Sequence, residues 1–198
     1  MTIKKFLKSK SFKSIVVLLV IALLCGGLLA ILNDVLFISE EEKTQRAIKE
    51  IYGSDMQYSV VELSESEKNN SYGEIVAVYA FVDGNYLIKA TGINGYQSGT
   101  ITAWLVVDFG NGEFNGINSV SVASNEKQSL ISNFGKDFTQ VYCNNDEGVK
   151  QGKYFAITEG EDELANVLSG ATKSSNAYNN AVNAALYYIR TFMQGGNE

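Results

Sequence analysis

Histidine and proline are both absent from the 198 residues, and cysteine occurs only twice, at Cys25 and Cys143. The absence of histidine removes the commonest metal ligand and the commonest general base near neutral pH. A hydrolase built on a serine–histidine pair is therefore excluded. The two cysteines are far apart and form no CxxC pair, which argues against zinc fingers, iron–sulfur clusters and c-type haem attachment. Any redox chemistry must then come from an organic cofactor.

The first 37 residues have the pattern of a membrane anchor. Residues 1–13 contain five lysines and no acid, and the nineteen residues 14–32 carry no charge. As a helix this run spans about 28 Å, close to the hydrocarbon thickness of a bilayer. Lysines before the run and acids after it, beginning with Asp34, place the N-terminus in the cytoplasm. We therefore predict a cytoplasmic basic segment at 1–13, a transmembrane anchor at 14–37 and an extracytoplasmic domain at 38–198.

A cleaved secretory signal starts with the same charged segment and is the alternative interpretation. The apolar run is longer than the roughly 7–15 residues of a signal core. No clear small-x-small cleavage site follows it directly. We therefore favour an uncleaved, single-pass anchor.

The predicted outer domain is acidic. Five of the 16 basic residues and one of the 22 acids precede residue 38, which leaves 11 basic residues against 21 acids and a net charge of −10. Nucleic acid binds to positively charged surfaces, so no nucleic-acid partner is expected. Solubility outside the cell is sufficient to explain the acidity.

The outer domain has the pattern of one α+β domain with a mainly antiparallel sheet and a closing C-terminal helix. Strand composition recurs at 57–63, 74–82, 86–90, 99–108 and 114–122, with turns at residues 83–85 and 110–112. Helices are predicted at 38–52, at 126–134 and, by apolar spacing, at 176–193. Residues 138–143 fit either a helix or a strand, and 144–153 read as a loop.

A short motif precedes the closing helix. Ser169-Gly170-Ala171-Thr172 is followed by Lys173, Ser174 and Ser175. The first backbone N–H groups of a helix have no intrahelical partner and carry partial positive charge, so small residues and hydroxyls there can hold a phosphate. The alternative is simple helix capping, with Ser174 or Ser175 at the N-cap.

With the anchor before the domain and the helix after the motif, the chain resembles the FMN-binding domain of two subunits. These are the G subunit of Rnf-type electron transport complexes and the C subunit of the sodium-translocating NADH:quinone reductase. The resemblance implies that Thr172 is esterified to the phosphate of FMN by a separate flavin transferase. It also implies cofactor contacts from Ser169, Gly170, Ala171, Ser174 and Ser175.

Two further stretches carry the resemblance. The run from Gly95 through Tyr96 and Gly99 to Ile101 matches a Gly-Tyr element that opens a strand in the family. The stretch after residue 125 corresponds to a family loop near the flavin ring, and it retains Glu126 and a leucine but not the proline and glycines. Tyr96 and Glu126 are therefore candidate flavin contacts. The alternative for Tyr96 is a half-buried aromatic residue of a strand, and the alternative for Glu126, which we favour, is a solvated carboxylate at the start of a helix. The chain also departs from the family at Asn166, where an acidic residue is usual.

The resemblance implies a membrane-anchored flavoprotein that passes electrons among neighbouring redox subunits of an ion-translocating oxidoreductase in a bacterial cell membrane. Such a domain is a redox carrier and not a catalyst by itself, and no residue constellation predicts acid–base catalysis or a metal site. The expected partners are other membrane subunits, the flavin transferase and the membrane. The alternative is a flavin-free extracellular binding or structural module that kept the fold.

Overall fold

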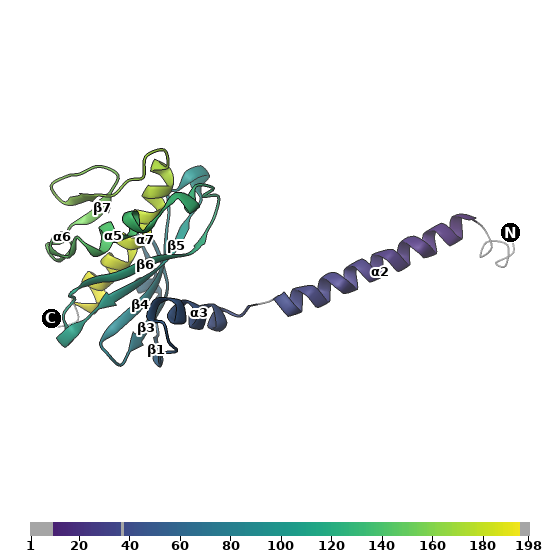
Figure 1. Cartoon of the computed structure of the whole chain (residues 1–198), viewed down its shortest axis with the longest axis horizontal. Helices are drawn as coiled ribbons and strands as arrows, with labels where there is room; N and C mark the ends of the chain where they lie inside the picture. The colour runs from purple at the N-terminus through teal and green to yellow at the C-terminus, as the bar shows by residue number, and fades with distance from the viewer. Residues whose placement is uncertain (1–9, 37, 195–198) are drawn as a thin grey trace. The chain divides into compact units, whose positions relative to one another are not determined.

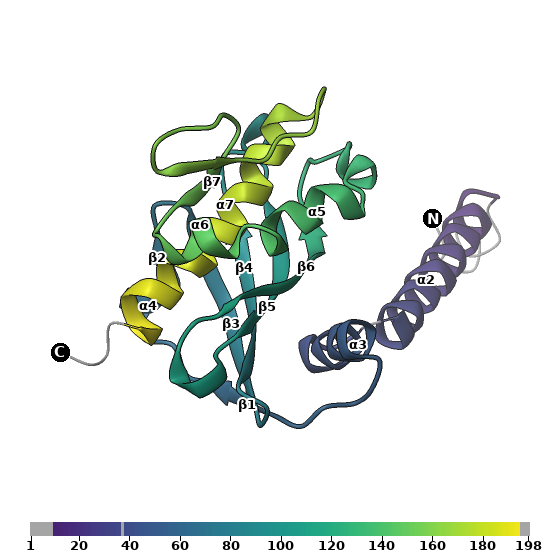
Figure 2. The same ribbon diagram turned by 60° about the vertical axis from the view of Figure 1, so that its left-hand side comes forward.

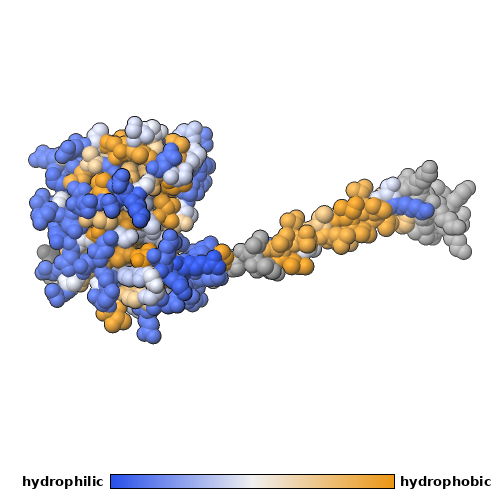
Figure 3. All heavy atoms as spheres, in the orientation of Figure 1, coloured by the Kyte–Doolittle hydropathy of each residue, from blue (hydrophilic) through white to orange (hydrophobic). Residues whose placement is uncertain are grey.

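The computed structural model describes residues 10–36 and 38–194, and the chain forms two compact units, Met1–Arg46 and Ala47–Glu198. In the first unit, α2 (Lys10–Leu36) is a continuous helix whose large apolar side chains from Ile15 to Leu32 are exposed, and Figure 3 shows a largely hydrophobic surface. Among the described residues, Phe12–Asn33 forms a helix long and apolar enough to cross a membrane, a criterion that a signal sequence also meets. The predicted apolar N-terminal helix is present.

Part of the predicted N-terminal organisation lies outside the described residues. This part includes residues 1–9, which contain three of the five lysines of the basic segment 1–13. It also includes residue 37, the predicted end of the anchor. The helix begins at Lys10, before the predicted start of the anchor at residue 14. Lysine is a good helix former, so the helical conformation extends past the apolar run.

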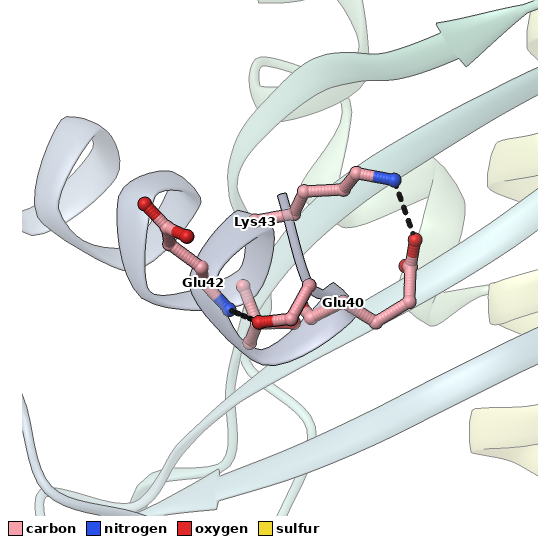
Figure 4. Close-up of polar contacts among 5 residues, drawn as sticks. Glu40, Glu42 and Lys43 are labelled. Atoms are coloured by element: carbon pink, nitrogen blue, oxygen red, sulfur yellow. Dashed lines mark hydrogen bonds and ion pairs between the residues drawn. The ribbon is translucent and has the colours of Figure 1, made fainter. Parts of the chain in front are cut away.

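The next helix, α3 (Glu40–Tyr52), begins with a capped first turn (Figure 4). The Ser39 hydroxyl accepts a hydrogen bond from the backbone N–H of Glu42 at 3.1 Å, and the Lys43 ammonium lies 2.7 Å from the Glu40 carboxylate. The acidic residues of this turn complement the positive end of the helix dipole. This helix agrees with the one predicted at 38–52.

The second unit is built on a six-stranded sheet in the order β1-β3-β4-β5-β6, with β2 paired to β3. Every pair is antiparallel, as predicted. The strands are β1 (Tyr58–Val61), β2 (Asn69–Asn70), β3 (Gly73–Phe81), β4 (Asn85–Gly92), β5 (Ile101–Asp108) and β6 (Gly116–Asn125). In the turn between β3 and β4, the Asp83 carboxylate accepts the Asn85 N–H at 3.0 Å.

The strand β5 is buried on both faces of the sheet, which explains its continuous apolar sequence. Leu105 lies in the hydrophobic cluster that includes α7. Its neighbours Trp104 and Val106 lie in a second cluster, with Ile48 from the later part of α3. The sheet is therefore covered on both faces, and the larger core lies on the α7 side.

The closing helix α7 (Thr172–Tyr188) packs against β4 and β5 (Figures 1 and 2). Its buried residues include four alanines: Ala177, Ala181, Ala184 and Ala185. A Cβ atom added at Gly92 of β4 would lie 2.1 Å from both the Ala177 carbonyl oxygen and the Ala181 nitrogen. Helix and strand therefore meet backbone to backbone, and small residues on both sides permit this distance. The helix ends in a π-helical turn, η4 (Ile189–Met193).

The remaining elements are short. They are α4 (Glu65–Lys68), η1 (Tyr96–Ser98), η2 (Gly110–Gly112), η3 (Ile131–Asn133), α5 (Lys136–Cys143), α6 (Asp146–Lys150) and the parallel pair β7 (Tyr154–Ala156) and β8 (Glu163–Ala165). The prediction of one α+β domain with an antiparallel sheet and a closing helix is confirmed.

Two local predictions were wrong. The helix predicted at 126–134 is an irregular loop with only the η3 turn, because Lys127 adopts a φ of 58° that a helix cannot contain. The loop predicted at 144–153 contains α6, which begins with two acids and ends with Lys150, charges that suit the helix dipole. A single turn is too short for periodicity to reveal.

Two further boundaries differ from the sequence pattern. The undecided segment 138–143 belongs to α5, which buries Phe138 and Tyr142 four residues apart on one helix face. The closing helix begins at Thr172 and not at residue 176, because its first turn consists of polar residues that show no apolar spacing.

The close contact between Gly92 and α7 predicts that Gly92→Ala lowers the melting temperature of the full-length protein in mild detergent by about 5 °C or more. The added methyl group must push the helix away from β4. Gly135→Ala is the matched control, because a Cβ there meets nothing within 4 Å and the change should cost less than about 1 kcal/mol. Equal melting temperatures for the two variants would contradict this packing of helix on strand.

Candidate functional site

A cavity of about 470 Å³ opens where three segments of the second unit meet: the η1 turn, the loop after β6 and the first turn of α7. Its lining consists of Tyr96, Ser129, Leu130, Gly170, Ala171, Thr172, Lys173 and Ser174. The volume falls within the roughly 300–1,000 Å³ typical of small-molecule sites. Two large side chains, Tyr96 and Leu130, three serine or threonine hydroxyls and one ammonium group therefore surround one space.

The first turn of α7 presents unpaired backbone donors to this cavity. Ala171 is the N-cap residue, and no side chain caps the helix. The first intrahelical bond runs from the Ser175 N–H to the Ala171 carbonyl oxygen at 2.8 Å. The N–H groups of Thr172 to Ser174 therefore precede the helical ladder. Alanine is a poor N-cap, and the contrast with the Ser39 cap of α3 shows that this turn leaves donors free.

The turn before the helix is held in place from within. Gly170 has a φ of 80°, a conformation that glycine adopts without strain. The fully buried hydroxyl of Ser175 accepts the Leu168 N–H at 2.9 Å and donates to the Ala171 carbonyl at 3.1 Å. These two residues fix the path of the chain into Thr172.

The electrostatics of the cavity favour an anion. Lys173 contributes an ammonium group, and none of the described lining residues is a carboxylate. The N-terminal end of the α7 dipole adds partial positive charge at the same place. The Thr172 side chain is exposed, and its hydroxyl makes no hydrogen bond to the described part of the chain. Within an acidic domain, this local positive charge is suited to a phosphate.

The Tyr96 loop forms the opposite wall. Asn94, Gln97 and Ser98 all have positive φ angles, an arrangement that costs free energy at non-glycine residues. Two asparagines of α7 hold the preceding strand end, because the Asn176 and Asn180 side chains donate to the carbonyl oxygens of residues 94 and 93. The loop conformation is therefore imposed by its neighbours.

The structure brings together five of the eight residues expected at the site: Tyr96, Gly170, Ala171, Thr172 and Ser174 all line the cavity. Ser169 is exposed and does not line the cavity. The Ser175 hydroxyl is buried and bonds to the backbone of the turn before α7. The Glu126 carboxylate lies in solvent, 3.5 Å from the Lys127 ammonium, and only its backbone takes part in the loop.

Asn166, where the resembling family usually has an acid, lies in the core. Its side chain donates to the Phe138 carbonyl at 3.2 Å, and its own carbonyl accepts from the Asn179 amide at 2.9 Å. Asn166 is 4% exposed and joins α5 to α7. Its role is structural, and it does not line the cavity.

Sequence reasoning missed Gln128, Lys173 and Leu130 as site residues. Leu130 supplies apolar wall and Lys173 supplies charge. Gln128 does not line the cavity but is bonded to two of its walls. No sequence signal distinguishes this glutamine from other polar loop residues. The sequence does contain a sign that α7 carries polar contacts. Asparagines at 176 and 180, and at 179 and 183, stand at i, i+4 spacing among its apolar residues.

The titratable groups in the core between α5 and α7 remain neutral. Burial raises the pKa of Tyr142 well above its ordinary value, and burial also raises the pKa of Tyr178. Burial, with a smaller contribution from Asp146, raises the pKa of the Cys143 thiol. These three side chains therefore stay protonated near neutral pH, and none of them lines the cavity.

Residues 95–187 match the family model of the FMN-binding domain. The match covers a little under half of the chain, and it includes the Tyr96 loop, the loop after β6 and most of α7. It indicates FMN as the cofactor and supports the resemblance noted in the sequence. A search among curated proteins finds no match to the chain.

The cavity fits FMN, the cofactor that the family match indicates, at the phosphate end. The uncapped first turn of α7, which contains Thr172 and Lys173, lines the cavity, and its N–H groups and positive charge suit a phosphate. Tyr96 and Leu130, 50% and 40% exposed, provide apolar surface for a planar ring. The donor set therefore suits a phosphate joined to an aromatic group.

The positive first turn predicts a charge effect that needs no ligand. Thr172→Asp should stabilise the flavin-free protein relative to Thr172→Asn by about 0.3–1 kcal/mol, because only the carboxylate interacts with the helix dipole. Urea unfolding of both variants at low salt measures the difference, and 1 M salt should reduce it by screening. A difference of zero at low salt would show that the turn is not electropositive.

Proposed function

We propose that this chain is a membrane-anchored electron-transfer flavoprotein that carries FMN covalently through its phosphate on Thr172. The observation that carries the proposal is the position of Thr172, whose exposed hydroxyl opens α7 at the wall of the cavity. The match to the FMN-binding domain supports FMN as the group attached. The apolar helix α2 supports attachment to a membrane.

The residues of the chain hold and orient the cofactor. The N–H groups of the α7 first turn and the Lys173 ammonium balance the phosphate charge. Tyr96 and Leu130 bound the apolar part of the cavity. FMN, when bound, supplies reversible electron uptake and release, and the protein contributes position and electrostatic environment. A covalent bond also retains the cofactor outside the cell, where lost FMN is not readily replaced.

Attachment requires a transferase that presents a flavin phosphoryl donor. The Thr172 Oγ1 atom forms the bond to phosphorus, its proton is released, and the bond between phosphorus and the leaving group of the donor breaks. The exposed hydroxyl and the small neighbours Gly170 and Ala171 leave space for this approach. The protein gains the mass of FMN less one water.

The anchor, the acidic domain and the resemblance together support a place in an Rnf-like or Nqr-like ion-translocating oxidoreductase. In that setting the domain accepts electrons from one membrane subunit and passes them to another. The competing function is a flavin-free extracellular module. The altered loop favours it, because Gln128 and Ser129 stand where the family has proline and glycine.

Covalent attachment predicts a fluorescent band on a denaturing gel after co-expression with a flavin transferase, together with the mass gain of one FMN less one water. Thr172→Ala should lose both signals because the hydroxyl is removed. Thr172→Ser and Ser169→Ala are the matched controls, and both should retain them. An unmodified wild-type mass under these conditions would refute the covalent attachment and favour the flavin-free module.

The charge pattern around α2 predicts that everything after the anchor lies outside the cytoplasm. A reporter that is active only outside the cytoplasm, fused after residue 198, should therefore be active in cells. A reporter that requires the cytoplasm, fused at the same place, is the control and should be silent. The reverse pattern of activities would overturn the proposed orientation.

A further inference from the structure

Gln128 connects the walls of the cavity through a single side chain. It follows β6, and its side chain is almost completely buried, with 1% of the residue exposed. The amide oxygen accepts the backbone N–H of Tyr96 at 3.1 Å and the hydroxyl of Ser174 at 2.8 Å. The amide nitrogen donates to the carbonyl oxygens of Tyr96 at 3.2 Å and Glu126 at 2.7 Å. All donor and acceptor positions of the amide are used.

The direction of this amide follows from its backbone partners. The Tyr96 N–H can only donate, and the carbonyl oxygens of Tyr96 and Glu126 can only accept. A flipped amide would place donor against donor and acceptor against acceptor. The amide oxygen must therefore face Ser174, and the Ser174 hydroxyl must donate its proton to it.

This constraint changes what Ser174 offers to a ligand. A serine hydroxyl has one proton, and Ser174 gives that proton to Gln128. Only lone pairs of the Ser174 oxygen remain on the cavity side. Phosphate oxygens are also acceptors, so they gain no hydrogen bond from this hydroxyl. The donors left for a phosphate are the N–H groups of the α7 first turn and the Lys173 ammonium.

Two glycines, Gly95 and Gly99, leave room for the Gln128 side chain because they have no Cβ atom. A Cβ atom at Gly95 would lie 2.7 Å from the Gln128 amide nitrogen, and one at Gly99 would lie 2.6 Å from it. The same atoms would also approach backbone oxygens of residues 99 and 126 at 2.5 and 2.2 Å. The Gly-Tyr element is therefore shaped around the glutamine side chain.

We propose that Gln128 is a positioning residue of the flavin cavity. Its amide fixes the Tyr96 loop and accepts the only proton of the Ser174 hydroxyl. The phosphate is therefore held by the N–H groups of the α7 first turn and by Lys173. The proposal rests on the function proposed above. It assigns Ser174 a structural role and removes it from the phosphate ligands that the family motif implies.

The test uses the full-length protein co-expressed with a flavin transferase, in wild-type, Ser174→Ala, Gln128→Met and Gln128→Glu forms. Flavin content by mass, the visible flavin spectrum and the melting temperature are measured for each. Ser174→Ala should keep wild-type flavin content and spectrum, because its hydroxyl donates nothing to the phosphate. Gln128→Met should lower flavin content by about tenfold and alter the spectrum, because several buried polar groups lose their partner.

Gln128→Glu supplies a readout that packing alone does not produce. The new carboxylate keeps both acceptor contacts but meets the Tyr96 and Glu126 carbonyl oxygens without a proton, so its folded-state pKa is raised. Stability relative to wild type should therefore be low at pH 8 and recover as the pH falls toward 5, where protonation restores one donor. The titratable side chains of the segments around Gln128, which are Tyr96, Glu126, Lys127 and Lys173, are the same in both proteins, so comparison with wild type at each pH removes their contribution.

Loss of flavin in Ser174→Ala at an unchanged melting temperature would overturn the inference, since the hydroxyl would then bind the phosphate directly. A Gln128→Glu protein with the pH profile of wild type would also overturn it. Wild-type protein without flavin would refute the proposed function itself, and the phosphate assignment with it. Ser54→Ala, which changes an exposed hydroxyl that does not line the cavity, is the control and should match wild type in every measurement.

Discussion

The backbone contact between α7 and β4 is the constraint on which the second unit depends. Gly92 permits it from the strand side, and Ala177 and Ala181 permit it from the helix side. The beginning of this helix lies beside the segment that follows β4, because the Asn176 amide donates to the Asn94 carbonyl oxygen just before the Tyr96 loop. The cavity exists where these two segments and the loop after β6 converge.

Polar side chains then fix the loops around this frame. Asn176 and Asn180 hold the end of β4, while the Asn183 amide bonds both the N–H and the carbonyl of Phe155 at 2.8 Å. Gln128 completes the arrangement between the Tyr96 loop and α7. Buried amides of this kind are useful because each pairs with backbone groups that would otherwise be unsatisfied. Their bonds give the loops one conformation, which a rigid cofactor site requires.

The strongest sequence patterns predict the fold where the physical signal is local. The apolar run of α2, the alternating or continuous apolar strands and the alanine spacing of α7 can all be recognised in the amino-acid sequence. The predictions failed where side chains override local pattern. The 126–134 segment has helical composition, but Lys127 turns the chain into a left-handed conformation and Gln128 bonds to its neighbours instead of forming a helix. The start of α7 was predicted four residues too late because its first turn, Thr172 to Ser175, consists of polar residues that show no apolar spacing.

The sequence by itself determined the α+β class, the apolar N-terminal helix and the position of a phosphate-compatible motif before the last helix, because each depends on residues close together in the chain. Only the tertiary structure decided which hydroxyls share the cavity. Thr172 and Ser174 line it, but Ser175 is turned into the bend below and Ser169 stands outside the lining. It also decided that Ser174 gives its proton to Gln128, 46 residues away. A hydrogen-bond partner so distant in the chain is set by the packing of helix on sheet, which no local pattern encodes.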